Sequence, residues 1–417
     1  MSRHTARAAI AVGGTVVAAL VLAGCGQGFS SGGSSGSAGG LTSSKKPLTL
    51  MIGSSGDAET KAVQDAAAAW SKKSGVDVTV VPATKLAEQL AQGFAAGSPP
   101  DVFYLSTDAI AGLAQNKSLK AYGDMLGNKG DFYPSLVKNF TVNDTFYCAP
   151  KDFSTLQLII NTDLWTKAGL TDADIPKTWD QLADDAKKLT SGSTKGLVFS
   201  GEYARIGAFM AQAGGRLVSE DGKKAEADSA ANVKALDYVK QHLNDGTFAY
   251  AKDVGAGWGG EAFGKQLGAM TIEGNWITGA MQTDYPNVKY KVAELPAGPA
   301  GKGTLQFTNC WGMAAASKNQ KAGLDFIEYL TSSDQQLKFS KAFGPMPSVK
   351  SAAETWKSDN GPLVPFLTGA DYAQGVPTNA GAADVIADFN SQLETLKTSD
   401  PKTILQSVQT NLEAVVK

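Results

Sequence analysis

Aromatic side chains beside small or polar residues are the strongest chemical signal in this chain. Trp258, Trp276 and Trp311 each adjoin glycine or asparagine. A flat aromatic face packs on apolar C–H groups, while carboxylate, amide and guanidinium groups bond hydroxyl groups. This combination indicates a site for a hydroxyl-rich ring such as a sugar. Further contacts expected there are Glu202, Arg205, Asn275 and Asn309, the first two in a loop after the strand at 197–199.

Motifs that suggest catalysis or nucleotide binding fail their structural tests. Gly28–Gly32 matches a serine nucleophile pattern but has no strand before it and no helix after it. Gly255–Gly260 matches a dinucleotide pattern but lacks the strand and the acid that such a site needs. A P-loop-like segment, Gly259–Lys265, is followed by Gln266 where a serine or threonine is required. We therefore interpret these segments as turns or tether sequence, and expect no catalytic residue and no cofactor from them.

Histidine usage argues against a metal centre. His242 is the only histidine beyond the first few residues, and it lies in an amphipathic helical stretch where we expect it on the surface. The net charge is −2, and it becomes two units more negative if Arg3 and Arg7 are removed. Without a concentrated basic face, nucleic-acid binding is not expected.

The first part of the folded body reads as alternating strands and helices. Strands are predicted at 47–52, 76–80 and 101–105, with helices at 57–74 and 85–96 between them. This alternation predicts a parallel sheet, whose ligands bind beyond the carboxyl ends of its strands. Ser55 and Asp57 follow the first strand, and Asp108 follows the third.

In later segments, too, the spacing of hydrophobic residues is typical of helices or strands. A helix is predicted from Thr178, its N-cap, to Leu189, another over 230–243, and a buried strand over 268–272. Trp70 and Trp179 lie on or beside apolar helical stripes, so we expect them in the core. The last seventy residues are predicted to be mostly helical, with apolar faces formed by Leu393, Leu396, Ile404, Leu405, Val408 and Leu412.

The N-terminal segment predicts export and a lipid anchor. Residues 1–24 have a short basic start and an uncharged apolar run, and they end in Leu-Ala-Gly before Cys25. This arrangement is typical of a lipoprotein signal peptide, after which Cys25 would carry acyl chains such as palmitate. Residues 25–45 are then rich in glycine and serine and read as a flexible tether. We expect the body at the extracellular face of the cell membrane.

Two further cysteines, Cys148 and Cys310, remain in the body. In an oxidising compartment an isolated pair favours a disulfide, although spacing alone leaves two free thiols possible.

Several segments together resemble a known family. They are Leu48–Trp70, Pro100–Asp108, Tyr147–Pro150 with Asn161–Leu164, Glu261–Lys265 with Met270–Trp276, and Gly312–Asn319. In order and spacing they are similar to extracellular solute-binding proteins of bacterial ABC importers, in the carbohydrate-binding, maltose-binding-protein-like branch (family 1). The resemblance covers nearly all of residues 46–417.

The resemblance implies an α/β, two-lobed periplasmic-binding-protein (type II, Venus-flytrap) fold with a three-crossing hinge. One lobe would comprise 46–148 with 311–345, and the other 149–310 with 346–417. The crossings would fall near 147–152, 307–311 and 345–347, which would place Cys148 and Cys310 at the hinge and favour their disulfide.

The same resemblance implies roles for individual residues. Trp276 takes the place of a stacking aromatic, Asp108 that of a hydroxyl-binding acid, and Asp152 lies near a family acid at the first crossing. A further aromatic of maltose-binding protein has no counterpart near 378–382, where Tyr372 is the nearest candidate. This departure favours a sugar other than maltodextrin.

The implied function is a monomeric, lipid-anchored receptor that gives a carbohydrate to an ABC permease with a cytoplasmic ATPase. Two alternatives stay open at this point. An exported glycosidase would need a carboxylate pair such as Asp108 and Asp152. A receptor of the same fold for an amino acid or anion would set Arg205 or Arg216 against a carboxylate.

Overall fold

The fold is that of a computed structural model, which describes residues 40–416. Cys25, the signal peptide 1–24 and most of the 25–45 tether lie outside the described residues. Within 40–416, no helix is both long enough and apolar enough to cross a membrane.

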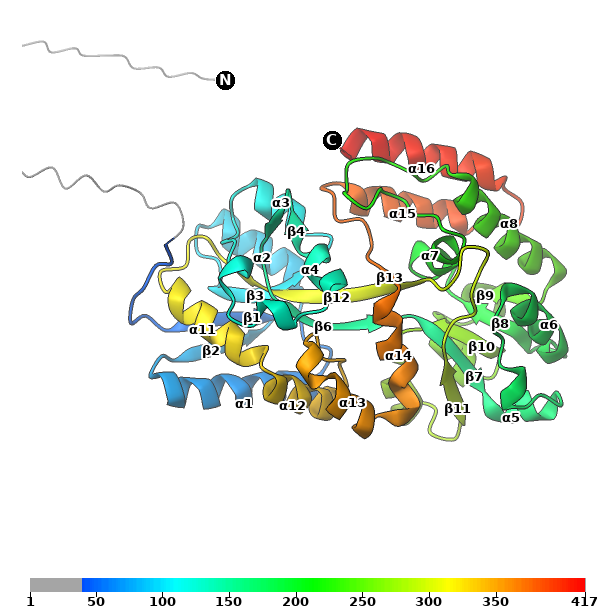
Figure 1. Cartoon of the computed structure of the whole chain (residues 1–417), viewed down its shortest axis with the longest axis horizontal. Helices are drawn as coiled ribbons and strands as arrows, with labels where there is room; N and C mark the ends of the chain where they lie inside the picture. Colours follow the sequence, from blue (N-terminus) through cyan, green and yellow to red (C-terminus); the bar gives the residue numbers. More distant parts are fainter. Residues whose placement is uncertain (1–39, 417) are drawn as a thin grey trace, which may run out of the picture. The chain divides into compact units, whose positions relative to one another are not determined.

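A mixed sheet forms the first lobe and extends toward the second (Figure 1). The strands β1 (Leu48–Ile52), β2 (Val78–Pro82) and β3 (Val102–Ser106) pair in parallel in the order β2-β1-β3, with two helices between them in sequence, which confirms the predicted parallel unit. The strands of this sheet are β1 (Leu48–Ile52), β2 (Val78–Pro82), β3 (Val102–Ser106), β6 (Pro150–Thr155), β12 (Thr304–Met313) and β13 (Ala373–Gln374). A separate hairpin joins β4 (Thr141–Val142) and β5 (Thr145–Phe146).

Helices of the first lobe pack on this sheet through one hydrophobic cluster that runs from Leu48 to Ala352 in sequence. They are α1 (Asp57–Ser74), α2 (Leu86–Ala95), α3 (Ile110–Gln115), α4 (Pro134–Asn139), α11 (Gln320–Leu330) and α12 (Ser333–Phe343). The apolar stripe of α1 that contains Trp70 is buried, as expected. Gly75 ends this helix with φ of +72°, a left-handed conformation that favours glycine.

The second lobe has its own sheet, in the order β11-β7-β10-β8-β9. Its strands are β7 (Gln157–Asn161), β8 (Lys195–Phe199), β9 (Phe248–Tyr250), β10 (Gly268–Glu273) and β11 (Tyr290–Ala293). The helices in this part of the chain are α5 (Thr162–Lys167), α6 (Trp179–Leu189), α7 (Tyr203–Gln212), α8 (Ala230–Asp245), α9 (Gly259–Gly264), α10 (Ile277–Thr283), α15 (Ala382–Leu393) and α16 (Pro401–Val415). The side chain of Thr178 caps α6 as predicted, and all six apolar residues predicted for the C-terminal helices are buried.

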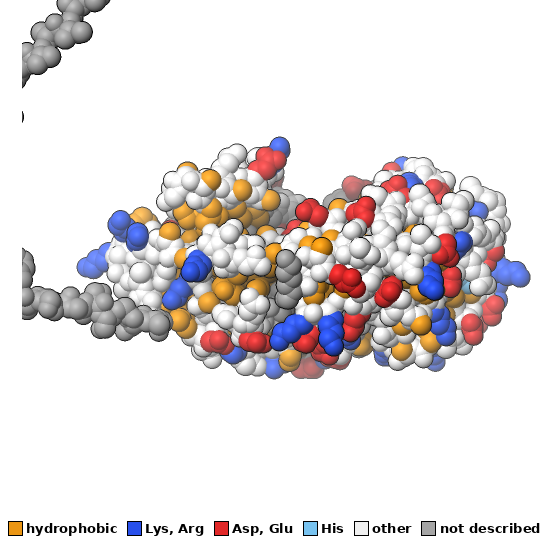
Figure 2. All heavy atoms as spheres, turned by 90° about the horizontal axis from the view of Figure 1, so that it is seen from above, with side chains coloured by type: hydrophobic (Ala, Val, Ile, Leu, Met, Phe, Trp, Pro, Cys, Tyr) orange, Lys and Arg blue, Asp and Glu red, His pale blue; other side chains and the backbone are white. Residues whose placement is uncertain are grey.

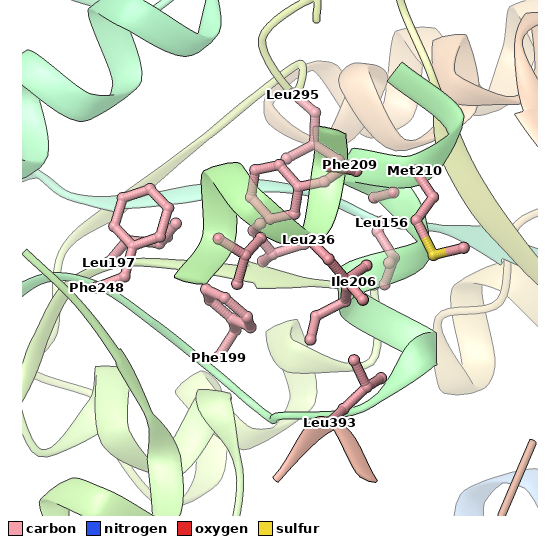
Figure 3. Close-up of a cluster of buried hydrophobic side chains, with 14 of the residues drawn as sticks. Leu156, Leu197, Phe199, Ile206, Phe209, Met210, Leu236, Phe248, Leu295 and Leu393 are labelled. Carbon is pink, nitrogen blue, oxygen red and sulfur yellow. The ribbon is translucent and has the colours of Figure 1, made fainter. Parts of the chain in front are cut away.

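Side chains from strands and helices of this lobe converge in one core (Figure 3). Leu197 and Phe199 from β8 meet Ile206 and Phe209 from α7, while Leu393 comes from α15. This packing orients α7, so the residues on its first turn have defined positions. The sequence predicts Glu202 and Arg205 in a loop, and this is corrected: Glu202 is the N-cap of α7, and Arg205 lies within the helix.

His242 is a second correction. It is buried rather than on the surface, because its ring packs against Tyr238 and Phe248 with centroid distances of 4.7 and 4.8 Å. Its Nδ1 atom lies 2.9 Å from a carboxylate oxygen of Asp245.

Two antiparallel strands join the two cores. β6 leaves the first core at Ala149 and leads into β7, and β12 runs back from Leu305 in the second core to Cys310 in the first. Met346 forms an isolated bridge with Phe153 of β6, and both belong to a third cluster that also contains Trp356 of α13 (Ala353–Asp359) and Phe366 of α14 (Val364–Thr368). Close to the three expected crossings, the chain thus passes from one hydrophobic cluster to another. The exact lobe boundaries stay a prediction.

Cys148 and Cys310 are bonded in the structure, with their Cα atoms 5.8 Å apart. Both lie in the first core, where each is almost completely buried.

Candidate ligand-binding site

Trp276 exposes part of its indole ring just after the end of β10. Its exposed fraction is 39%, and Met125 is the other large hydrophobic side chain with comparable exposure among the described residues. The ring folds back over Gly274, where an added Cβ would lie 2.2 Å from Cζ3 of the indole. Glycine is therefore required at this turn by the close approach of the ring. Phe307 of β12 meets the indole edge-on, with 5.7 Å between the ring centroids.

An ion-pair group of Glu273, Arg205 and Glu202 contacts the same indole. Oε2 of Glu273 accepts hydrogen bonds from Nε1 of Trp276 at 2.9 Å and from Nη2 of Arg205 at 2.6 Å. Nη1 of Arg205 donates to Oε1 of Glu202 at 2.8 Å, and the guanidinium carbon lies 5.6 Å from the centre of the indole ring. Burial raises the pKa of Glu273, while Arg205 and the indole N–H oppose that rise.

The strands β6 and β12, which cross between the lobes, place polar groups beside the indole. Asp152 of β6 and Asn309 of β12 are direct partners in the ladder, as are Ser154 and Phe307. Oγ of Ser154 accepts a hydrogen bond of 2.9 Å from the backbone N–H of Asn275. Residues two apart on a strand share a face and lie roughly 7 Å apart. Asp152 and Asn309 thus lie on the same faces of their strands as Ser154 and Phe307, two residues away. Phe307 packs against the indole of Trp276, and Ser154 bonds the neighbouring Asn275.

A second buried charge cluster lies on the side of the first lobe. Nζ of Lys151 is 3.1 Å from Oε1 of Glu59 on α1 and also pairs with the carboxylate of Asp152. Tyr104 donates its hydroxyl to Oε1 of Glu59 at 2.8 Å. The backbone N–H and hydroxyl of Ser55 donate to Oε2 of Glu59, at 2.8 and 2.7 Å. The loop after β1 is thereby tied to the strand that crosses between the lobes.

The pKa values of the two carboxylates in this cluster, Glu59 and Asp152, are shifted in opposite directions. Burial acts to raise the pKa of Glu59, but Lys151 and the hydrogen bonds from Ser55 and Tyr104 outweigh it and hold the pKa below the ordinary 4.5. For Asp152 burial outweighs the attraction of Lys151, so its pKa is raised. The lysine itself is stabilised in the charged form by both acids and by Tyr104.

A narrow pocket with no room for a water molecule adjoins this cluster. It is lined by Tyr104, Lys151, Asp152, Trp311, Gln336, Phe339, Phe343 and Pro345. The pocket thus lies where β3, β6 and β12 meet α12.

The structure brings together part of the predicted set. Six of the residues are linked through contacts or strand pairing along the crossing strands and the start of α7, and Ser55 is joined to them through Glu59. The six are Asp152, Glu202, Arg205, Asn275, Trp276 and Asn309.

The other predicted residues make no hydrogen bond, ion pair or ring contact with these six among the described residues. Asp57 lies exposed in the first turn of α1, and Asp108 is exposed in the turn after β3. Trp258 is half-buried and packs against the third cluster as the N-cap of α9. Tyr372 is half-buried, and its hydroxyl donates to Oε2 of Glu294 at 2.9 Å.

Trp311 is a correction to the expected set. The ring has no exposed surface and packs edge-on against Tyr104, with 5.1 Å between centroids. An indole enclosed in this way offers no face to a ligand, so we leave Trp311 out of the site.

Several residues of the site were missed from the sequence. Glu273, Phe307, Glu59 and Lys151 were not selected. Glu273 could have been found as an acid that ends a buried strand directly before Gly274. Lys151 stands next to Asp152, but nothing local shows that its ammonium group is buried against Glu59.

A fold of two α/β lobes joined by crossing strands, with an aromatic and polar site along those strands, defines a ligand-binding receptor of the periplasmic-binding-protein type. The chain belongs to the bacterial extracellular solute-binding protein family, whose model matches residues 65–365. It is thus a solute-binding protein of an ABC transporter. Members of this family bind solutes and do not catalyse reactions, which removes the glycosidase alternative.

Known relatives agree with this assignment over most of the chain. The galactooligosaccharide-binding protein of Bacillus subtilis is 24% identical over 416 residues, covering 95% of this chain and 94% of that protein. The maltooligosaccharide ABC transporter solute-binding lipoprotein of Streptococcus pneumoniae is 27% identical, covering 81% and 79%.

Solved structures share the fold. The cyclic alpha-maltosyl-1,6-maltose binding protein from Arthrobacter globiformis matches with a TM-score of 0.79 at 20% identity, covering 89% of this chain and 99% of that one. The two-lobed α/β fold expected from the sequence is thus confirmed.

Proposed function

We propose that this protein captures an uncharged sugar or oligosaccharide between its lobes and delivers it to the permease of an ABC transporter. The observation that carries the proposal is the exposed indole of Trp276, which Phe307 and Arg205 support beside the polar face of the crossing strands. An open aromatic face next to carboxylate and amide groups suits a ring that is apolar on its faces and hydroxylated on its rim. Two of the relatives carry names that refer to oligosaccharides.

The charges of the site favour an uncharged ligand. Arg205 is bonded to Glu202 and Glu273, and Lys151 is paired with Glu59 and Asp152. Each of these two cations is already shared between two carboxylates, so acids outnumber bases in the group. A carboxylate or phosphate on a ligand would meet like charge there, which disfavours an amino acid, a sugar acid or a sugar phosphate.

A thermal-shift panel tests this function. Maltose, maltotetraose and a galactooligosaccharide form the neutral arm, and glucose 6-phosphate and glucuronate form the anionic arm. A neutral sugar at a hundred times its dissociation constant should stabilise the protein by about 2.7 kcal/mol, whereas the anionic sugars should give no shift.

Trp276→Ala should abolish that shift and leave the unliganded protein folded. Met125→Ala is the matched control, because Met125 has 38% exposure and lies in the other lobe. If Trp276→Ala keeps its sugar affinity, or if only the anionic sugars stabilise the protein, the proposal fails.

We also propose that the protein acts as a monomer held at the outer face of the membrane through Cys25. The lipoprotein pattern before this cysteine and the lipoprotein relative support this anchor. Labelled palmitate should be incorporated into the wild-type protein in a bacterial host, and Cys25→Ser should remain unlabelled. Equal labelling of the two would contradict the anchor.

A further inference from the structure

Glu273 is the point at which two elements of the site meet. It ends β10, and its side chain has no exposed surface. A single oxygen, Oε2, accepts one hydrogen bond from the indole N–H of Trp276 and one from the guanidinium of Arg205. The two donors belong to different segments, the turn after β10 and helix α7.

Without this carboxylate, the indole would have fewer restraints. Trp276 is one of the most exposed large hydrophobic side chains described, and Phe307 restrains it only by an edge contact. Arg205 lies near the ring, but its position also depends on the bond to Glu273. Ordering a mobile aromatic side chain when a ligand binds costs conformational entropy, and a side chain ordered beforehand avoids that cost.

The surroundings of Glu273 are not arranged for maximal stability. Oε1 of Glu273, Oγ1 of Thr271 and Nε of Arg205 are buried and have no hydrogen-bond partner within the protein. A Cβ added at Gly259 would lie 2.6 Å from that Oε1 and 2.8 Å from that Oγ1, so α9 begins in direct contact with this group. Buried polar atoms without partners destabilise a fold, and their concentration at one place is a mark of function.

We propose that Glu273 is a positioning residue that sets the indole of Trp276 and the guanidinium of Arg205 in place before the sugar arrives. This inference rests on the proposed function and deepens it. Glu273 itself has no surface with which to touch a ligand, so its effect on binding is exerted through Trp276 and Arg205.

The first test needs no sugar. In ¹⁵N-labelled protein, the indole N–H resonance of Trp276 is identified by its absence in Trp276→Phe. Its proton should exchange slowly with solvent in the wild-type protein, and in Glu273→Gln its resonance should shift and its exchange should accelerate by about tenfold or more. If the wild-type indole proton exchanges as fast as that of free tryptophan, the inference is overturned whether or not any sugar binds.

The second test is a double-mutant cycle, in which affinity is measured by calorimetry with the neutral saccharide of the panel that stabilises the wild-type protein most. Trp276→Phe keeps an aromatic face but removes the N–H that Glu273 holds. Glu273→Gln should weaken binding by about tenfold in the wild-type background and by no more than about twofold in the Trp276→Phe background. Equal weakening in the two backgrounds would show that Glu273 does not act through the indole N–H.

A matched control separates positioning from general stability. Asp185→Asn changes another buried carboxylate that pairs with a basic residue, Lys188, on α6. It should lower the melting temperature without changing sugar affinity.

Should Glu273→Gln not fold, the wild-type exchange rate and the affinity of Trp276→Phe still decide the matter. An unprotected indole proton, or unchanged affinity in Trp276→Phe, refutes the inference. If no panel sugar binds while the indole proton is protected and depends on Glu273, the proposed ligand class fails and the positioning role stands.

Discussion

At the scale of single residues, buried acids in this protein differ in what they stabilise. Glu59 accepts hydrogen bonds from Ser55 and Tyr104 and pairs with Lys151, so its ionised form is favoured although it is buried. Its role is to connect α1 with the crossing strand β6. Glu273 instead connects Trp276 and Arg205, which we propose as contacts for the ligand.

The lowered pKa of Glu59 makes a prediction about stability and pH. A carboxyl whose pKa is lower in the folded than in the unfolded state stabilises the fold above the unfolded pKa, and this is lost as the pH falls through the folded value. The wild-type protein should therefore lose this contribution progressively below about pH 4.5. At pH 7, Glu59→Gln should reduce the free energy of unfolding by about 2–3 kcal/mol, because Lys151 keeps only Asp152.

Urea unfolding of both proteins between pH 3 and pH 7 measures this effect. The difference between them should shrink toward low pH, where Glu59 is protonated. Glu88→Gln is the control, since the pair of Glu88 with Lys85 is exposed and should contribute less than about 1 kcal/mol. A difference that stays constant with pH would contradict the prediction.

At the scale of elements, the turn between β10 and α10 determines where the indole lies. Its length is short, and Gly274 leaves room for the ring of Trp276 to fold back over the backbone. The same turn contains Asn275, whose backbone N–H bonds Ser154 on β6. One tight turn thereby connects the second sheet with a crossing strand.

Gly274→Ala should displace the indole, because the new methyl group would overlap the ring while the backbone conformation remains accessible to alanine. We expect sugar affinity to fall by about tenfold or more, with the melting temperature lowered only slightly. Gly279→Ala is the control. A Cβ at Gly279, within α10, meets nothing within 4 Å, so this change should leave affinity unchanged and favour the helix by up to about 1 kcal/mol. Equal affinities for the two variants, measured by calorimetry, would count against the role of the turn.

At the scale of the whole described fold, two cores are joined by strands that pass from one to the other. On the face shown in Figure 2, hydrophobic side chains gather toward the side of the first lobe, while acidic and basic side chains intermingle toward the second. The Cys148–Cys310 disulfide lies in the first core, where Cys148 shortly precedes β6 and Cys310 lies within β12. It therefore fastens both crossing strands to one lobe.

Removing this disulfide should destabilise the protein without abolishing sugar binding. The bonded residues are 162 positions apart, and closing a loop of that length contributes about 5 kcal/mol in the chain-entropy model. The double variant Cys148→Ala, Cys310→Ala should unfold at a lower denaturant concentration, with the affinity changed by less than about threefold. The same unfolding midpoint as the wild-type protein would exclude a stabilising disulfide.

Much of the architecture could be predicted from local patterns. The buried face of α1, the cap of α6 at Thr178 and the parallel β2-β1-β3 unit all follow from period and turn chemistry. His242 was misjudged because an amphipathic helix does not reveal that Phe248 of the following strand will cover its polar side.

The residues of the candidate site also divide into those that the sequence indicated and those that only the structure revealed. From the sequence by itself, the resemblance to the family selected Trp276 and Asp152 as candidate ligand contacts, and the residue types added Asn309 as an expected contact. Only the tertiary structure decided that Trp311 is enclosed, that Arg205 is already bonded to two acids and that Glu273 holds the indole. The reason is physical: burial and pairing of these side chains arise from contacts between segments far apart in the chain, which no local period or spacing encodes.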